Sequence, residues 1–502
     1  MDGGVAGMLG GAVGSKGLEP FASLAAQGAM IERLSSDSRR CAPGVAFFAY
    51  PGESADGRAY IAEAIEHGAT AVLWEERGFT WNEQWRLPNV AVAGLRQQAG
   101  FLAHEFYGRA SESLWACGVT GTNGKTSCSQ WIAALLGRRG VKAGVIGTLG
   151  CGYPGALSGA SNTTPDTLEL HRMLKTFLAD GARAVAMEVS SHGLAQGRVN
   201  GVRFACALFT NLSHDHLDYH GSMQAYAQAK ALLFDTPHLG SAVLNLDDAL
   251  GVQLAQRLAR RGVRTIGYSL SRAGVVPGSV SEFVAASAVD GERVELESSR
   301  GAASAVVRPL GRFNLANALG VLGVLLAYGV PFGEAAALLA ELPPVPGRMQ
   351  AVAEQPLVVV DYAHTPDALE KVLHALRPVA GARGGELIAV FGAGGDRDPA
   401  KRPLMGEIAA RLADRVVLTS DNPRSEDPLA IIEAIRRGVA GRCEVEPDRA
   451  RAIAQALAAA ASQDVVLIAG KGHENYQEIA GTRLPFSDEA AVRSALARRG
   501  RP

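Results

Sequence analysis

The chain has 502 residues, of which 47% are hydrophobic and 20% charged, and its formal net charge is -1. That length predicts about three domains, and the composition is typical of a globular protein with large buried cores. Because there is no basic surplus to neutralise a phosphate backbone, the charge excludes a general nucleic-acid binder, and anionic ligands must be held by a few local charges.

Two features bear on the compartment. The six cysteines (41, 117, 128, 151, 206 and 443) are scattered without a Cys-x-x-Cys pair, which favours reduced thiols in a cytoplasmic protein. The first 17 residues are rich in glycine and lack both the basic region and the continuous apolar core of a signal peptide. The longest apolar stretch, 318–330, is too short and too interrupted by glycine to span a bilayer, so we expect no membrane insertion.

Residues 18–110 alternate between helical and strand patterns. Apolar runs predict strands at 45–49 and 71–74, and amphipathic patterns predict helices at 60–67 and 95–107. We therefore expect a small α/β module. Taken alone, these residues favour a docking or dimerisation role.

A phosphate-binding loop is predicted between a buried strand at 114–120 and an amphipathic helix that begins at Thr126. The turn between them consists of small residues and ends in Gly124-Lys125-Thr126. Glycine lets backbone amides approach a phosphate, the helix N-terminus adds positive potential, the lysine adds a charge, and the threonine hydroxyl can ligate magnesium. The usual pattern has glycine where this chain has Val119, so the loop is a variant. It predicts that the chain binds a nucleoside triphosphate.

The alternation continues behind this loop, with strands predicted at 142–147, 184–189, 205–210 and 242–246. This alternation of strands and helices predicts a mostly parallel sheet that binds ligands at the carboxyl ends of its strands. Polar clusters follow several of these strands, among them 188–192 and 211–220. A β-meander is expected at 281–310, and a helix at 314–328.

The histidine-rich loop raises the question of a metal site. His216 and His220 have the i, i+4 spacing that would bring them together on a helix, as in some zinc sites. No Glu or Cys partner has metalloenzyme spacing, and a phosphate loop beside acidic strand ends suits magnesium better. His216 and Glu188 are therefore the expected ligands of a metal that bridges the phosphates. His214 and His220 are also compatible with structural roles.

Lys230 lies in the apolar helical stretch 226–234. The simplest interpretation is a surface lysine whose stem covers apolar neighbours. A desolvated lysine would instead have a lowered pKa, and its amine could act as a nucleophile or react with carbon dioxide. The periodicity leaves both interpretations open.

A third α/β unit is expected after the proline-rich linker 343–348. Near-continuous apolar runs predict buried parallel strands, at 357–361, 386–391, 415–420 and 464–469. Arg397 and Arg424 lie in polar loops that follow these strands, and arginine forks match carboxylates in two-point contacts. One sheet with a triphosphate site and another with arginines suggest a ligase that brings an acid and an amine together.

Four motifs carry a family resemblance: 120–126 (TGTNGKT), 215–220 (DHLDYH), 361–367 (DYAHTPD) and 470–474 (GKGHE). Together they resemble the Mur ligases, the ATP-dependent ligases of peptidoglycan synthesis, and the resemblance covers residues 30–490. It implies an α/β protein of three domains. These are an N-terminal UDP-binding domain (1–110), a central ATP-binding domain with a P-loop-type ATPase sheet (111–345), and a C-terminal amino-acid-binding, Rossmann-like domain (346–502).

The resemblance also implies residue roles and the cofactors ATP and Mg²⁺. The implied ATP contacts are Gly121, Thr122, Asn123, Gly124, Lys125, Thr126, Asn314, Asn317 and Arg348. The implied contacts to UDP-MurNAc-L-Ala-D-Glu are Ser36, Ser38, Glu53, Ser54, Ala55, Asn162, Thr163, Thr164, Ser190, Gln196 and Arg198. The implied magnesium ligands are Thr126, Glu188, His216 and a carbamylated Lys230, which replaces the surface-lysine interpretation. The implied catalytic residues are Lys125, Glu188, His216 and Lys230.

Specificity is implied by the run Asp421-Asn422-Pro423-Arg424, which is similar to the motif of family members that take meso-diaminopimelate. Lysine-adding relatives usually lack that arginine. The implied amino-acid site is completed by Arg397, Gly470 and Glu474. Lysine would leave Arg424 unpaired, and a site built for a polar group rejects the analogue that lacks it by about 10⁴–10⁵-fold. Ala393, where relatives often have cysteine, is a departure that touches no assigned role.

The implied reaction is phosphorylation of the D-glutamate γ-carboxylate by ATP, followed by attack of the diaminopimelate amine on the acyl phosphate. The third domain must close on the second to bring the two together, and a monomer is expected. Two alternatives remain. One is another enzyme of the superfamily, such as a folylpolyglutamate synthetase or a different Mur ligase, which the Asp-Asn-Pro-Arg motif and the Asp37-Ser38-Arg39 segment disfavour. The other is a non-catalytic nucleotide-binding scaffold, which would be expected to lose one of the four catalytic residues.

Overall fold

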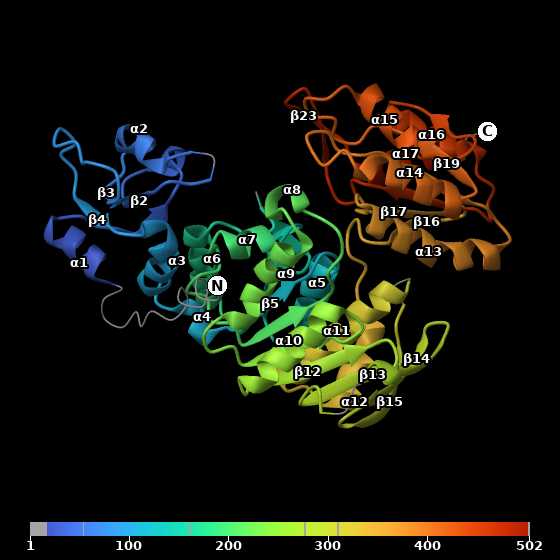
Figure 1. Cartoon of the computed structure of the whole chain (residues 1–502), viewed down its shortest axis with the longest axis horizontal. Helices are drawn as coiled ribbons and strands as arrows, with labels where there is room; N and C mark the ends of the chain where they lie inside the picture. Colours follow the sequence, from blue (N-terminus) through green and yellow to red (C-terminus); the bar gives the residue numbers. More distant parts are fainter. Residues whose placement is uncertain (1–17, 54, 160–161, 276–277, 309–310, 500–502) are drawn as a thin grey trace.

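The structure is a computed structural model that describes every residue except 1–17, 54, 160–161, 276–277, 309–310 and 500–502. Three sheets, each with its own helices, follow one another along the chain, as the colours of Figure 1 show. The α/β fold class with three successive units is thus confirmed.

The first unit has a four-stranded parallel sheet in the order β1-β2-β3-β4. Its strands and helices are α1 (Glu19–Ala26), β1 (Arg33–Ser35), β2 (Val45–Ala49), α2 (Ile61–Glu66), β3 (Ala71–Glu75), β4 (Asn89–Val92), α3 (Leu95–Phe106) and α4 (Ala110–Ser113). The predicted strands and helices of this unit are present. β1 and β4 are only three and four residues long, too short for an apolar pattern to be recognised from the sequence.

The second unit has an eleven-stranded sheet in the order β15-β14-β13-β12-β11-β10-β5-β9-β6-β7-β8. Its seven central strands, from β13 to β6, run parallel, and antiparallel strands extend both edges. The elements are β5 (Trp115–Thr120), α5 (Lys125–Arg138), β6 (Ala143–Gly147), β7 (Gly150–Tyr153), β8 (Ala156–Ser158), α6 (Thr167–Ala179), β9 (Ala184–Glu188), α7 (Ser191–Ala195), β10 (Cys206–Phe209), α8 (Leu217–His220), α9 (Met223–Ala231), β11 (Ser241–Asn245), α10 (Ala249–Arg260), β12 (Arg264–Ser269), β13 (Glu282–Asp290), β14 (Arg293–Ser298), β15 (Gly301–Val306), α11 (Arg312–Tyr328) and α12 (Phe332–Leu338).

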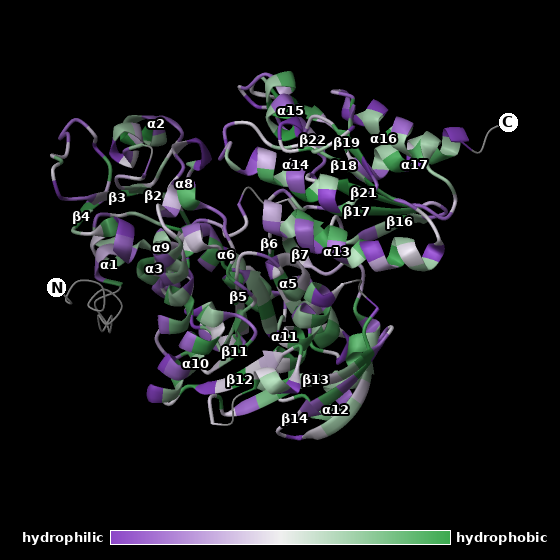
Figure 2. Ribbon diagram, turned by 45° about the vertical axis from the view of Figure 1, so that its right-hand side comes forward, coloured by the Kyte–Doolittle hydropathy of each residue, from purple (hydrophilic) through white to green (hydrophobic). Residues whose placement is uncertain are grey.

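Helices cover both faces of this sheet. One core joins α5, α11 and α12 to the sheet, and the other joins α6 and α10 to the opposite face. In Figure 2, α10 carries hydrophilic and hydrophobic residues along its length, as expected of a helix that buries one side. In contrast, α11 is buried on nearly all sides, which explains its long apolar run. No helix in the described part of the chain is long and apolar enough to cross a membrane.

The third unit has a six-stranded sheet in the order β16-β17-β21-β18-β19-β20, in which only β16 is antiparallel to its neighbour, and a separate hairpin, β22-β23. Its elements are β16 (Gln350–Glu354), β17 (Leu357–Asp361), α13 (Pro366–Arg383), β18 (Leu387–Phe391), α14 (Lys401–Leu412), β19 (Arg415–Leu418), α15 (Pro428–Arg436), β20 (Glu444–Val445), α16 (Arg449–Ala459), β21 (Val465–Ala469), β22 (Tyr476–Ile479), β23 (Thr482–Pro485) and α17 (Asp488–Arg499). All four predicted strands are present and buried.

Candidate active site

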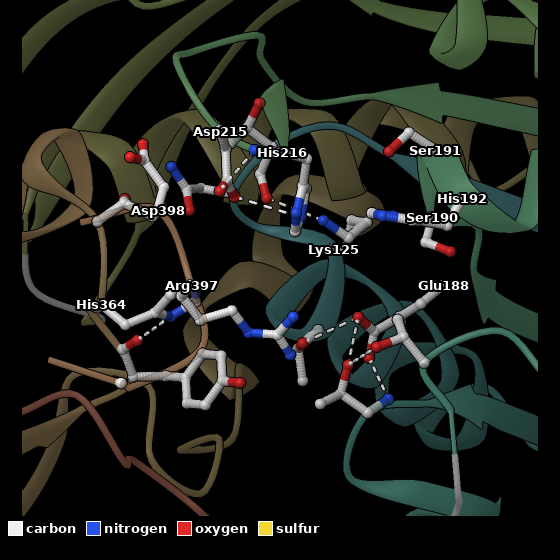
Figure 3. A pocket seen from close by; sticks show the side chains of 18 of the residues that line it. Lys125, Glu188, Ser190, Ser191, His192, Asp215, His216, His364, Arg397 and Asp398 are labelled. Atoms are coloured by element: carbon white, nitrogen blue, oxygen red, sulfur yellow. Dashed lines mark hydrogen bonds and ion pairs between the residues drawn. The ribbon is translucent and has the colours of Figure 1, made fainter. Parts of the chain in front are cut away.

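A large cavity with a volume of about 510 Å³ lies between the second and third units. It is lined by loops that follow β5, β9 and β10 on one side and β17, β18, β19 and β21 on the other. In the close view of Figure 3, Lys125 and Glu188 from the second unit face the region of Arg397 and His364 from the third. The phosphate loop and the predicted amino-acid loops therefore open into one space.

The phosphate loop requires glycine at two positions. Gly121 has φ +152°, and a Cβ atom there would collide with the Thr210 hydroxyl. Gly124 has φ +87°, and a Cβ atom there would collide with the Asn317 amide oxygen. Because L-residues rarely adopt these conformations and there is no room for a side chain, both positions accept only glycine.

Lys125 begins α5 at the edge of the cavity. Its ammonium donates hydrogen bonds to the carbonyl oxygens of Gly121, at 2.7 Å, and Thr122, at 2.8 Å. Burial lowers the pKa of Lys125, and the nearby carboxylates of Glu188 and Asp215 oppose that shift. The cation thus lies at the N-terminal end of the helix, where a phosphate is expected.

Glu188 ends β9 and is fully buried, at 1% exposure. Its Oε2 accepts hydrogen bonds from the hydroxyls of Thr126, at 3.0 Å, and Thr148, at 3.1 Å. Its Oε1 accepts one from the backbone amide of Thr148, at 2.7 Å. Arg348, the last residue of the linker, donates to the Thr126 hydroxyl at 3.0 Å. Two predicted magnesium ligands are thereby in contact, although they are 62 residues apart in the sequence.

The histidine loop differs from the helical pair that its spacing suggests. His216 has φ +54° and caps α8, and His220 ends that short helix. Each ring instead lies near His192, with ring centres 4.8 and 5.4 Å away. Burial lowers the pKa of His216 to about 4, against the opposing effect of Asp215. No group of three or more His, Cys, Asp or Glu side chains is arranged to hold a metal among the residues that the structure describes.

Lys230 is buried, at 1% exposure, and lines the cavity. Its Nζ lies 4.2 Å from the centre of the Tyr226 ring. Burial, together with the charge of Lys125, lowers the pKa of Lys230 well below its usual value. The surface-lysine interpretation is therefore wrong, because the helix faces the cavity at this position and not the solvent.

A smaller cavity of about 80 Å³ adjoins the phosphate loop. Three predicted ATP contacts, Asn314, Asn317 and Arg348, line it together with Asn123 and Gly124 of the loop. The Asn317 amide donates to the Asn314 side-chain oxygen at 3.4 Å. The predicted ATP contacts therefore extend continuously from the large cavity into the small one.

Most of the predicted sugar-peptide contacts in the second unit line the large cavity: Asn162, Thr163, Thr164, Ser190 and Arg198. The Thr164 hydroxyl donates to the Ser190 hydroxyl at 3.1 Å, and the Arg198 guanidinium donates to the Thr164 carbonyl at 2.8 Å. Gln196 lies just outside and accepts a hydrogen bond from Arg198 at 2.8 Å. These residues form one connected wall.

The predicted contacts in the first unit lie apart from both cavities: Ser36, Ser38, Glu53 and Ala55. Ser54 lies outside the described residues. The Ser38 hydroxyl donates to Glu63 at 2.7 Å. Glu53 accepts hydrogen bonds from Tyr219, at 2.6 Å, and Gln196, at 2.7 Å. Glu53 therefore connects the first unit to the wall of the large cavity, and neither of the two cavities includes Ser36, Ser38, Glu53 or Ala55.

All but one of the predicted amino-acid contacts line the large cavity: Arg397, Asp421, Asn422, Arg424, Gly470 and Glu474. The exception is Pro423, whose carbonyl packs against Gly395. Arg424 has φ +51°, and its backbone bonds to Glu478 and Ala480 of the β22-β23 hairpin, at 3.0 and 2.7 Å. Its guanidinium donates to the Gly395 carbonyl at 2.7 Å and is 22% exposed. The hairpin thus holds this arginine at the cavity edge.

Two further residues at the junction of the units were not predicted. One oxygen of Asp367 accepts hydrogen bonds from Asn123, at 3.2 Å, and Ser213, at 2.8 Å, and so ties the third unit to the phosphate loop. Lys401 lines the cavity and donates to the His364 carbonyl at 3.0 Å. Asp367 lies within the 361–367 motif, which was the available signal. Lys401 had none, because only the closeness of the two units gives it a position in the site.

Comparison with protein families gives three matches along the chain. Residues 30–107 match the Mur ligase family, catalytic domain; residues 119–325 match the Mur ligase middle domain; and residues 347–472 match the Mur ligase, glutamate ligase domain. Each match falls within one of the three units.

Similar proteins and structures agree with these matches. The UDP-N-acetylmuramoyl-L-alanyl-D-glutamate–2,6-diaminopimelate ligase of Chromobacterium violaceum is 50% identical over 473 residues, covering 93% of this chain and 95% of that protein. The same-named ligase of Pseudomonas aeruginosa is 50% identical over 482 residues, covering 93% and 95%. A solved structure of a ligase with this name has a TM-score of 0.66 and 37% identity, covering 94% of this chain and 96% of that chain. The MurF ligase of Thermotoga maritima in complex with ADP, 18% identical with a TM-score of 0.62 and covering 94% and 98%, shares the fold.

Proposed function

The chain belongs to the Mur ligase family of ATP-dependent amide-forming ligases in peptidoglycan synthesis, and we propose that it joins meso-diaminopimelate to the D-glutamate of UDP-MurNAc-L-Ala-D-Glu. The names of relatives that are about half identical over nearly the whole chain support this reaction. The observation that carries it is the single cavity that the phosphate loop shares with the arginine-bearing loops of the third unit. A ligase needs its activated acid and its amine in one such space.

In the first step, ATP phosphorylates the γ-carboxylate of D-glutamate and leaves as ADP. Lys125 would hold the transferred phosphate, since its ammonium lies at the N-terminus of α5. Arg348 contacts Thr126 from the third unit and adds a second positive charge at the same place. Charges fixed in this way stabilise the transferred phosphoryl group without reorganisation during the reaction.

Magnesium fits the donors at this site. Thr126 and Glu188 offer hard oxygen atoms 3.0 Å apart beside the phosphate loop, which suits a magnesium ion. We propose that Thr126, Glu188, His216 and a carbamylated Lys230 hold it. The buried amine of Lys230 would form an N–C bond with carbon dioxide and release a proton, which converts a cation into an anionic oxygen ligand. When bound, the ion would neutralise phosphate charge.

In the second step, the free amine of diaminopimelate attacks the acyl carbon, and phosphate leaves. Arg424 and Arg397 would hold carboxylates of the diamino acid, because guanidinium forks pair with carboxylates in two-point contacts. Asp421 and Glu474 would receive its distal ammonium. Asn162 to Thr164, Ser190 and Arg198 would hold the peptide end of the other substrate along the opposite wall.

The proposed division of labour follows the three units. Residues 1–110 would bind the UDP part, 111–345 the ATP, and 346–502 the amino acid. We also propose that the protein acts as a monomer. Six free cysteines support a reducing, cytoplasmic environment.

The test is product mass. Purified protein is incubated with ATP, magnesium, UDP-MurNAc-L-Ala-D-Glu and either meso-diaminopimelate or L-lysine, and the products are identified by mass spectrometry. We expect the diaminopimelate tripeptide with one ADP per product. Preferential addition of lysine would overturn the substrate assignment. ATP turnover on a folate in place of the UDP-peptide would point to a different enzyme of the superfamily.

A further inference from the structure

Lys471 is a fully buried cation behind the wall of the proposed diaminopimelate site. It lies two residues after the end of β21, has 0% exposure, and is not among the residues that line the cavity. Its ammonium donates to the Asn422 side-chain oxygen at 2.9 Å and to Glu474 Oε2 at 2.8 Å. It also lies 3.8 Å from Asp421 Oδ1. A buried lysine is normally paired, and all three of its partners line the cavity.

The bonds made by Lys471 fix the orientation of Asn422. The Asn422 oxygen accepts from Lys471 and from the backbone amide of Glu478, at 3.0 Å. Its amide nitrogen must therefore point the other way, and it donates to Glu474 Oε2 at 2.8 Å. Exchanging the oxygen and nitrogen would place donor against donor at Lys471 and Glu478, and acceptor against acceptor at Glu474. Lys471, together with the backbone amide of Glu478, thus fixes which polar group Asn422 presents.

Lys471 bonds to only some of the carboxylate oxygens around it, so the other oxygens of Glu474 and Asp421 remain available to a ligand. Glu474 Oε2 is occupied by two donors, whereas Glu474 Oε1 has no hydrogen-bond partner among the described residues. The carboxylate of Asp421 likewise accepts no hydrogen bond from any described residue, although Asp421 is only 6% exposed. A Cβ atom at Gly470 would collide with Asp421 Oδ2, so this carboxylate is also confined.

The three charged groups in direct contact, Asp421, Glu474 and Lys471, together carry one net negative charge. Asp421 and Glu474 carry two negative charges, and Lys471 supplies one positive charge. A single ammonium from the ligand would complete the balance, and a buried carboxylate without a partner is costly. Arg424 lines the same cavity, donates to the Gly395 carbonyl and lies 4.0 Å from Glu478, and its remaining donors would pair with a carboxylate on the same carbon as that ammonium.

We propose that Lys471 is a positioning residue that orients Asn422 and Glu474. It also sets the net charge of the corner formed by Asp421, Asn422 and Glu474, so that this corner receives the distal ammonium of diaminopimelate. This inference rests on the proposed function. Lys471 does not touch the substrate; it acts through Asn422 and Glu474. It therefore affects recognition of the distal ammonium, whereas Arg424 affects recognition of the distal carboxylate.

The test compares two amino acids in wild-type protein and in Lys471→Met. One is meso-diaminopimelate, and the other is 2-aminopimelate, which keeps both carboxylates and the attacking amine but lacks the distal ammonium. We expect Lys471→Met to lower kcat/KM for diaminopimelate by about 10- to 100-fold, the loss of one or two charge-assisted hydrogen bonds. The smaller activity on 2-aminopimelate changes by less than threefold, and the KM for ATP stays the same. Ile435→Val, a buried core change in α15 of the same unit, is the matched control and leaves the ratio of the two substrates unchanged.

Equal losses for both substrates, or no loss for either, would overturn the role of Lys471. If Lys471→Met does not fold, Glu474→Gln and the double variant Lys471→Met/Glu474→Gln decide the matter, since the double variant removes both charges together. We expect the two to have similar kcat/KM for diaminopimelate, because Lys471 acts largely through Glu474. A further tenfold loss in the double variant would contradict the inference. Absence of diaminopimelate ligation in the wild-type protein would instead refute the proposed function itself.

Discussion

Arg424 offers the sharpest test of substrate recognition. Its guanidinium lines the cavity, its backbone is bonded on both sides to the β22-β23 hairpin, and its side chain is 22% exposed. Replacement by alanine removes the fork that would hold the distal carboxylate. A charge-assisted hydrogen bond contributes about 1.5–3 kcal/mol, which corresponds to a fall of roughly 10- to 150-fold in kcat/KM for diaminopimelate.

The assay measures phosphate release with diaminopimelate varied at saturating ATP, and then with ATP varied at saturating diaminopimelate. We expect Arg424→Ala to raise the KM for diaminopimelate. The KM for ATP should stay within about twofold of the wild-type value, since Arg424 lies away from the phosphate loop. Arg424→Lys should recover only part of the activity, because an ammonium keeps the charge without the two-point geometry. Arg411→Ala on α14 is the matched control, since that side chain is half exposed and pairs with Glu370 outside the cavity.

Equal increases in the KM for both substrates would refute this reasoning, because they would indicate a general disturbance of the cleft. Full activity of Arg424→Ala on diaminopimelate would refute it more directly. Melting temperatures of all three variants show whether folding is preserved. This control matters because residue 424 has a positive φ, which residues other than glycine rarely adopt.

Four further outcomes are expected. Lys125→Met should lower kcat at least about 10³-fold with the fold intact, measured as ADP release, because the transferred phosphate loses its fixed cation. With ¹³C-labelled bicarbonate, a carbamate signal should appear in the NMR spectrum of the wild-type protein and be missing in Lys230→Met; lower pH should weaken it, since protonation of the amine blocks reaction with carbon dioxide. Burial lowers the pKa of His171 to about 4, so the contribution of this neutral side chain to stability is complete above pH 6.5 and is lost as the pH falls. Between pH 7 and 5 the free energy of unfolding of the wild-type protein, measured by denaturant titration, should fall by about 2 kcal/mol more than that of His171→Gln. Asp488→Asn should lower the free energy of unfolding by about 3–5 kcal/mol, because it leaves the guanidinium of Arg449 buried, at 0% side-chain exposure, without its anion.

Much of the fold follows from local patterns in the sequence. Strands such as β17 and β21 are continuous apolar runs, and they are fully buried in parallel sheets as such runs should be. The strands that were not predicted lack this signal. β12 is interrupted by Gly267 and has polar ends, and β7 contains two glycines. Their places are set by neighbouring strands that are already paired, which is a tertiary effect.

The site was predictable where it depends on strand ends. Residues after parallel strands meet at one edge of a sheet, so the contact between Thr126 and Glu188 follows from topology. The environment of Lys230 does not follow, because an apolar helical stretch has the same periodicity whether it faces solvent or a cavity. Lys471 and Asp367 were missed for a related reason, since their partners come from distant loops or from another unit.

The most direct test of the account follows one oxygen atom. UDP-MurNAc-L-Ala-D-Glu labelled with ¹⁸O in the γ-carboxylate is incubated with protein, ATP, magnesium and meso-diaminopimelate, and the released phosphate is analysed by mass spectrometry. If the carboxylate is phosphorylated and the amine then displaces phosphate within one cavity, each phosphate carries one ¹⁸O atom for every tripeptide formed. Tripeptide formation with unlabelled phosphate would contradict the account.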